Sequence, residues 1–238
     1  MGIFSDRQKI ISYCLKIIII VSAVVGIYLS ANAGRGFFMG GSRTFMYFTT
    51  QSNIVMAIIS AAGIYFVRRE KHIMWIWNIV KFVATVSITL TGVVFCTLLA
   101  PLLGEHAWSL HNILTHVVVP VASVIDFFVI AKSTRISHRD AFLVIIPPLL
   151  YVIYAGIGYA RGWEFADGRN YPYFFLNWGS PAGAFGFADE LPYMGTMWWI
   201  FVLLIFLIMV GRFYLAIADF LRKKNLKERN LKEKNSDE

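Results

Sequence analysis

The sequence has little charge and little cysteine. Only 15% of its 238 residues are charged, 58% are hydrophobic, and the mean hydropathy is +0.62. Soluble globular domains carry about 25% charged residues, so the composition excludes that class and indicates a membrane protein. The two cysteines, Cys14 and Cys96, fall near opposite ends of apolar runs. At the helical rise per residue they lie roughly 20 Å apart in depth, too far for a disulfide, and we expect both thiols to be buried as small apolar groups.

Motifs for metals, nucleotides and redox chemistry are also lacking. The sequence contains no HExxH, no CxxC and no Gly-rich phosphate loop. The five-residue spacing of His106, His111 and His116 places these side chains on different faces of a helix, so we expect no metal and no cofactor. The net charge of +8 lies beside the apolar runs, where it favours membrane lipids as partners and no nucleic acid.

Six apolar runs are each long enough to cross a bilayer as a helix, which takes about 20 residues. The predicted fold is therefore all-α, a polytopic membrane helix bundle with six transmembrane helices. The spans are expected at residues 10–30, 46–67, 76–100, 111–131, 141–160 and 193–220. Residues 1–220 form one membrane domain in this interpretation, and residues 221–238 form a basic cytoplasmic tail.

The positive charges predict the orientation of the spans. Of the 22 Lys and Arg residues, the ones on the other side of the spans are only Arg35, Arg43, Arg161 and Arg169. Because positive loops stay in the cytoplasm, we expect the N and C termini to be cytoplasmic.

The start of the chain leaves an alternative open. Its basic residues, the apolar run 17–29 and the small-residue triplet 31–33 resemble a cleavable signal peptide. We expect the segment to remain as the first span, because the apolar run begins near Ile10.

The longest connection, 161–192, is expected to form an extracytoplasmic cap. It reads RGWEFADGRNYPYFFLNWGSPAGAFGFADELP. Its Gly and Pro residues exclude a long helix, its aromatic residues suit a membrane interface, and loops beyond about 12–15 residues are often lids or binding loops. The tail RKKNLKERNLKEKNSDE, from Arg222 on, is either a solvated extension of the sixth span or disordered.

Polar side chains inside the spans are the candidates for function, because they are costly in lipid. Two groups lie at the outer ends of the second and fourth spans. The first comprises Thr49, Thr50, Gln51, Ser52 and Asn53, and the second His111, Asn112, Thr115 and His116. Pro120 follows the second group and removes a backbone hydrogen bond to His116, which predicts a kink there. Either group is a hydrogen-bonded contact between helices or the wall of a site.

Since both groups lie at the same level, we expect Thr49 and His116 to meet beneath the cap. A hydroxyl beside an imidazole base, with Asn53 or Gln51 as donors for an oxyanion, suits acyl transfer. Thr50 in place of Thr49, and His111 in place of His116, remain alternatives.

Asp126 lies deeper in the fourth span. A charge at such depth costs on the order of 2.5–3.5 kcal/mol, so the carboxyl group is expected to be protonated or paired with Lys81, Arg68 or a polar group of the first span. A structural ion pair is one interpretation. A proton relay is the other, and would suit a small-solute or proton-linked transporter.

Three stretches carry a resemblance to a known family. They are MYFTTQSNIV, LHNILTHVVVPVASVIDFF and YARGWEFADGRNYPYFFLNWG. Together they resemble the Pr-six-Pr family of bacterial six-span membrane proteins over residues 10–215, with Phe174 and Asn177 standing where the family pattern has a proline and an aspartate. The resemblance implies a location in the plasma (inner) membrane of a bacterium.

That family is remotely similar to the androgen-induced and androgen-dependent transmembrane hydrolases, which cleave fatty-acid esters with a threonine and a histidine. The resemblance implies Thr49 as nucleophile and His116 as base, and it adds Tyr171 and Tyr173 as supporting candidates. The protein is then a lipid-ester hydrolase acting near the outer leaflet. The alternative is a non-catalytic membrane scaffold or lipid-binding protein.

Overall fold

The structure is a computed structural model that describes residues 5–33, 40–69, 75–131 and 136–236. Within these ranges the chain forms helices and loops, and the described residues contain no β-strand beyond two isolated bridges. The predicted all-α fold is confirmed.

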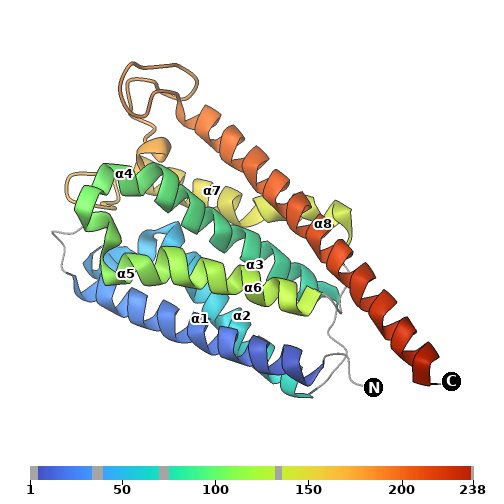
Figure 1. Cartoon of the computed structure of the whole chain (residues 1–238). Coiled ribbons are helices and arrows are strands. Elements are labelled where there is room, and N and C mark those ends of the chain that lie inside the picture. Colours follow the sequence, from blue (N-terminus) through green and yellow to red (C-terminus); the bar gives the residue numbers. More distant parts are fainter. Residues whose placement is uncertain (1–4, 34–39, 70–74, 132–135, 237–238) are drawn as a thin grey trace.

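Six helical segments in the described ranges are long and apolar enough to cross a membrane, as predicted. They are Asp6–Asn32, Phe48–Arg68, Trp75–Trp108, Leu110–Ile130, His138–Ala160 and Thr196–Glu228. The first, second and sixth correspond to single helices, namely α1 (Asp6–Asn32), α2 (Phe48–Arg69) and α8 (Thr196–Ser236). Helix α1 begins and α8 ends at the same end of the bundle (Figure 1), as an even number of crossings requires.

The other three segments are composite. The third consists of α3 (Trp75–Val94), the π-helical turn η2 (Phe95–Leu99), α4 (Ala100–Leu103) and the 3-10 helix η3 (Gly104–Trp108). The fourth consists of α5 (Leu110–Ile113), the π-helical turn η4 (Leu114–Val118) and α6 (Val119–Ala131). The fifth joins the 3-10 helix η5 (His138–Ile145) to α7 (Ile146–Ala160). Two shorter 3-10 helices, η1 (Gly41–Met46) and η6 (Phe174–Leu176), lie outside the spans.

The two π-helical turns are departures from the predicted spans. The sequence predicted a kink at Pro120, whereas the structure widens the helix over Leu114–Val118 and places Pro120 as the second residue of α6. A π-helical turn bonds residue i to residue i+5, and such turns occur frequently at functional sites.

Helix α3 lies inside the bundle and packs against α2, α6 and α8. Its buried residues include Phe82 and Val86, which belong to the main apolar core. Helix α1 packs on α2 and α6. Gly26 of α1 and Gly92 of α3 both lie against the fourth span near η4, where small residues allow membrane helices to approach closely.

The connection between α7 and α8 is folded. Its 3-10 helix η6 contributes Phe175 and Leu176 to the main core. Arg43 of η1 holds the segment with ion pairs to both Glu164 and Asp167. The Tyr47 hydroxyl donates to the carbonyl of Phe165 at 2.8 Å, and burial raises the pKa of Tyr47, so the phenol keeps its hydrogen.

Two further predictions are now decided. The helix α8 continues to Ser236 beyond the ends of the other helices (Figure 1), so the tail extends the sixth span through that residue. Cys14 and Cys96 are free thiols, but the prediction that they are buried is wrong, because both are exposed. The outer surface of a membrane bundle is itself apolar, so a small thiol suits that surface as well as the core.

Candidate functional site

Thr49 and His116 meet, as the sequence predicted. The Oγ1 atom of Thr49 lies 3.3 Å from Nε2 of His116. Thr49 belongs to the first turn of α2 and is 5% exposed, and His116 belongs to η4 and is 3% exposed. Catalytic hydrogen bonds are often this long before substrate binds.

The hydrogen bonds of His116 decide which ring nitrogen carries the hydrogen. Its Nδ1 atom lies 3.1 Å from the Asn112 carbonyl oxygen and 3.1 Å from the Thr115 hydroxyl. A carbonyl oxygen only accepts, so Nδ1 is the protonated nitrogen. The Thr115 hydroxyl donates its own hydrogen to the His111 carbonyl at 2.8 Å. Nε2 is therefore free to accept a hydrogen bond from Thr49, which is the tautomer that a general base needs.

Phe95 fixes the plane of the imidazole ring. The two rings stack with centroids 3.9 Å apart and planes 21° apart. Phe95 is the first residue of the π-helical turn η2, and His116 lies in the other π-helical turn, η4. The two widened turns of the bundle therefore meet at this ring pair. No sequence signal distinguished Phe95 from the other phenylalanines of the apolar runs.

Glycines on two neighbouring helices confine the backbone around His116. A Cβ atom built at Gly92 would lie 2.8 Å from the carbonyl oxygen of His116 and 3.2 Å from Pro120. A Cβ atom at Gly26 would lie 2.6 Å from the side chain of Thr115. Both helices thus approach the histidine segment more closely than any larger residue permits.

The amide residues of the first polar group are engaged in local bonds. Nδ2 of Asn53 donates to the carbonyl of Thr49 at 2.8 Å and to the carbonyl of Thr115 at 3.1 Å. Both amide hydrogens of Asn53 therefore have acceptors, and an oxyanion role would require one of these bonds to break. Nε2 of Gln51 donates to the carbonyl of Phe45 at 3.2 Å. Ser52 donates to the carbonyl of Thr49 at 3.0 Å.

Tyr173 brings the α7–α8 connection to the site. The backbone N–H of Thr49 donates to the Tyr173 hydroxyl over 3.5 Å, a long and weak bond. The Tyr173 ring stacks on Phe175 with centroids 5.1 Å apart. Burial raises the pKa of Tyr173, so its hydroxyl stays neutral and keeps a hydrogen to donate. Tyr171 is half-buried, and among the hydrogen bonds of the described residues none joins it to Thr49 or His116.

The alternative residues lie elsewhere. Thr50 is buried, and no hydrogen bond within the described ranges joins it to a histidine. His111 is half-buried, and its ring lies 3.2 Å from the Ser109 hydroxyl. The structure pairs Thr49 with His116 and leaves these alternatives apart.

An apolar cavity of about 60 Å³ lies beside Thr49. Residues of α2, α3, α7, α8 and the α7–α8 connection line it, and its polar wall includes Thr49 and Thr91. Tyr151 and Tyr173 form part of the same wall. Its volume is below the range of about 300–1,000 Å³ that ligand pockets occupy, so this cavity alone holds only a small group.

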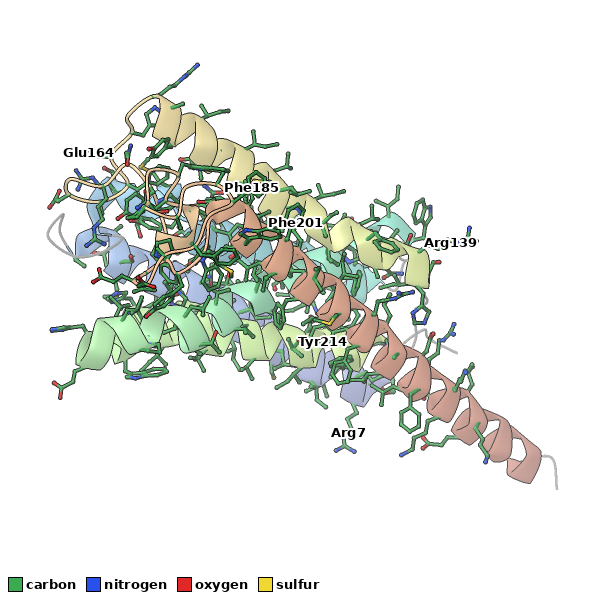
Figure 2. The ribbon with its side chains drawn as sticks, turned by 90° about the horizontal axis from the view of Figure 1, so that it is seen from above. Arg7, Arg139, Glu164, Phe185, Phe201 and Tyr214 are labelled. Atoms are coloured by element: carbon green, nitrogen blue, oxygen red, sulfur yellow. The ribbon has the colours of Figure 1, made fainter. Side chains whose placement is uncertain are left out.

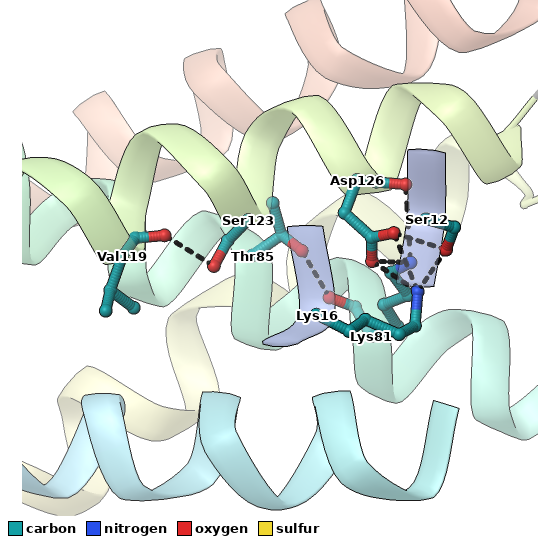
Figure 3. A network of polar contacts seen from close by, with 7 residues as sticks. All are labelled: Ser12, Lys16, Lys81, Thr85, Val119, Ser123 and Asp126. Atoms are coloured by element: carbon teal, nitrogen blue, oxygen red, sulfur yellow. Dashed lines mark hydrogen bonds and ion pairs between the residues drawn. The ribbon is translucent and has the colours of Figure 1, made fainter. Parts of the chain in front are cut away.

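Asp126 forms a second, separate cluster. Its carboxylate lies 2.6 Å from Nζ of Lys16 and 2.6 Å from Nζ of Lys81, and it accepts a hydrogen bond of 2.6 Å from Ser12 (Figure 3). The predicted pairing with Lys81 and with a polar group of the first span is confirmed, and Arg68 takes no part in the ion pairs of Asp126. Lys16 was missed because its position near the end of a span suggested only a topology signal.

Among the described residues, no group of three or more His, Cys, Asp or Glu side chains is arranged to hold a metal ion. Comparison of the chain with known protein families, with curated proteins and with solved structures finds no match. The functional argument therefore rests on the geometry of the site.

Proposed function

We propose that this integral membrane protein is a hydrolase that cleaves a lipid ester, with Thr49 as nucleophile and His116 as general base. The observation that supports it most is the buried contact between Thr49 Oγ1 and His116 Nε2. The base is oriented by a third group, here the Asn112 carbonyl, which is the arrangement of an activated nucleophile. Thr49 also lines an apolar cavity of about 60 Å³, where the reacting end of an ester would be shielded from water.

Because Nδ1 of His116 carries the hydrogen, Nε2 is the atom that accepts and returns the proton in each step of the proposed reaction. Thr49 Oγ1 attacks the ester carbonyl carbon while His116 Nε2 takes the hydroxyl proton. The tetrahedral adduct breaks its bond to the alcohol oxygen, and Nε2 returns the proton to that oxygen. Water then attacks the acyl-threonine by the same route in reverse, releasing a fatty acid and restoring Thr49.

The negative oxygen of the adduct needs hydrogen-bond donors. We assign this role to Tyr173, whose neutral hydroxyl lies at the cavity wall beside the Thr49 backbone. The donors of Asn53 and Gln51 are bonded to backbone carbonyls, which makes them less suitable.

We also propose membership of the Pr-six-Pr family. The three stretches that carry the resemblance supply Thr49, His116 and Tyr173 in turn. These residues are far apart in the sequence and lie together in the fold, which is what a shared site would require.

We infer that both termini face the cytoplasm of a bacterial cell, with the connection between α7 and α8 outside. The excess of Lys and Arg at the end of the bundle where α1 begins and α8 ends supports this orientation. An impermeant maleimide applied to intact cells tests it. A cysteine introduced at Ser236 should react only after lysis, and one introduced at Asp189 should react before it.

Proton-linked transport through Asp126 is the rival function. The carboxylate of Asp126 is engaged by Lys16, Lys81 and Ser12 at once, an arrangement that favours a structural ion cluster over a proton carrier.

Hydrolysis of a long-chain nitrophenyl ester in lipid nanodiscs tests the proposal. Wild type should turn over the ester, and Thr49→Ala and His116→Ala should each lower the rate by about 100-fold or more. Thr50→Ala, a neighbouring buried threonine, is the matched control and should retain the rate. Equal rates in wild type and Thr49→Ala at equal folded yield would favour a scaffold or lipid-binding protein.

A further inference from the structure

A second hollow, larger than the Thr49 cavity, lies between α2, α3 and α7. Its volume is about 540 Å³, within the range of about 300–1,000 Å³ that ligand pockets occupy. Apolar side chains line most of it, among them Val55 and Ile59 of α2, Val83 of α3 and Leu150 of α7. We refer to this hollow as the α2–α7 groove.

The rim of the α2–α7 groove is apolar and exposed. Val55 is 47% exposed and Leu150 is 62% exposed. Both belong to helices long and apolar enough to cross a membrane. The groove therefore opens sideways to the acyl chains of the bilayer rather than to water.

The length of the groove matches one leaflet. Along α2 its lining runs from Phe48 to Ile59, about 16 Å at the helical rise per residue. One leaflet contributes about half of a hydrocarbon core of about 30 Å. An extended acyl chain lying along α2 would thus fill the groove from its outer end to the middle of the membrane.

Three polar side chains belong to the lining, namely Gln51, Ser52 and Ser87. Gln51 and Ser52 make hydrogen bonds within the protein. The Ser87 hydroxyl is buried and has no hydrogen-bond partner among the described residues. Buried polar groups are nearly always paired, so the unpaired hydroxyl points to an occupant that carries an oxygen as well as a chain.

Only a thin wall separates the groove from the Thr49 cavity. Phe48 and Tyr151 line both hollows, and their rings pack edge to face with centroids 5.3 Å apart. Ser52 on the groove side bonds to Thr91 on the cavity side at 2.9 Å. The Tyr151 hydroxyl donates a hydrogen bond to the Met46 carbonyl at 3.1 Å, whereas the Phe48 ring has no polar group to hold it in place.

We propose that the α2–α7 groove binds the acyl chain of an ester lipid taken from the bilayer, and that Phe48 and Tyr151 form the gate between this chain and Thr49. Delivery to Thr49 rests on the proposed function, whereas binding of the chain does not. The groove gives the site lateral access for substrates that never leave the membrane.

Photo-crosslinking tests the binding step. The full-length protein in nanodiscs is irradiated with a phospholipid whose acyl chain carries a diazirine, and the labelled peptides are mapped by mass spectrometry. Labels should concentrate on the groove faces of α2, α3 and α7. Val55→Trp fills the rim and should lower this labelling about tenfold, which corresponds to ~1.4 kcal/mol of lost binding.

The matched control is Val121→Trp. Val121 is an exposed valine of α6 that does not line the groove, so this variant should leave the labelling unchanged. Labels spread evenly over all lipid-facing helices would overturn the proposal. A groove that stays unlabelled while the other lipid-facing helix surfaces are labelled would also overturn it, because the groove would then be closed to acyl chains.

Two esters separate this inference from the proposed function. Val55→Trp should slow hydrolysis of the long-chain ester and leave hydrolysis of nitrophenyl acetate unchanged, because the short ester does not need the groove. If wild type hydrolyses neither ester while its groove is labelled, the proposed function fails and the lipid site stands. An equal loss of hydrolysis of both esters in Val55→Trp would overturn the proposal that the groove supplies the long chain to Thr49, because the short ester does not need the groove.

Discussion

Phe95 stacks on the imidazole of His116, with ring centroids 3.9 Å apart and planes 21° apart. The stack joins the π-helical turns η2 and η4. It holds the ring in the plane that directs Nδ1 to the Asn112 carbonyl and Nε2 to Thr49. The proposed base is therefore positioned by the widened turns of two different spans.

Replacing the stacked ring should affect activity more than stability. Phe95→Leu keeps an apolar side chain and loses the aromatic contact, which is worth about 0.5–1.5 kcal/mol. We expect a fall in unfolding free energy of that size and a loss of ester turnover of about tenfold, because the imidazole is less well oriented. Phe128→Leu removes a half-buried ring that stacks on no histidine and serves as control. Full turnover in Phe95→Leu would contradict the positioning role.

The glycine at the histidine carbonyl should not tolerate a methyl group. In Gly92→Ala the new Cβ would lie 2.8 Å from a backbone oxygen, and overpacking of this kind costs about 1–3 kcal/mol. Thermal unfolding in detergent, followed by tryptophan fluorescence, should show a lowered Tm. Gly156→Ala on α7, where the Cβ meets nothing within 4 Å, should leave Tm unchanged or raise it. Equal Tm values for the two variants would show that α3 can move away from the His116 carbonyl at little cost in stability.

Asp126, Lys16 and Lys81 should contribute to stability together, because each charge in this buried cluster is compensated by the others. Asp126→Asn leaves Lys16 and Lys81 without their carboxylate, and the loss of one partner from a buried ion pair costs about 3–5 kcal/mol. We expect a low yield of folded protein in size-exclusion chromatography. Converting both lysines to Met in the same variant removes the unpaired charges and should restore much of the yield. A normal yield for Asp126→Asn alone would show that the lysines are compensated elsewhere.

The ion pairs of Arg43 with Glu164 and Asp167 should limit the mobility of the α7–α8 connection. Glu164 and Asp167 are exposed, so Arg43→Gln should lower global stability only slightly. Chymotrypsin should nevertheless cleave the connection faster in the variant, since its aromatic residues become accessible. Arg139, at the other end of the molecule from Glu164 (Figure 2), provides the control Arg139→Gln. Unchanged cleavage in Arg43→Gln would indicate that the apolar contacts of Phe175 and Leu176 hold the connection alone.

The fold was largely predictable because membrane helices are specified by the length of apolar runs and by the position of charge. The meeting of Thr49 and His116 was predictable for a related reason. Polar side chains inside a span are costly in lipid and face the interior of the bundle, so polar groups at the same depth of two spans are expected to lie close together.

The π-helical turns, the stacking of Phe95, the pairing of Lys16 and the exposure of the cysteines depend on packing between helices, which a single sequence does not reveal. A π-helical turn shifts a few backbone bonds, and Phe95 resembles any other apolar residue of its run. Lys16 pairs with Asp126, which lies 110 positions further along the chain, and only the fold brings the two together. The burial of the cysteines was wrongly predicted because an apolar run does not show which of its faces meets lipid.

Labelling with a fluorophosphonate, followed by mapping of the modified residue, tests the central claim most directly. The reagent should phosphonylate Thr49 in wild type and in Thr50→Ala, and the adduct should be absent from Thr49→Ala and His116→Ala at equal folded yield. An unlabelled but folded wild type, or an adduct on any residue other than Thr49, would contradict the account.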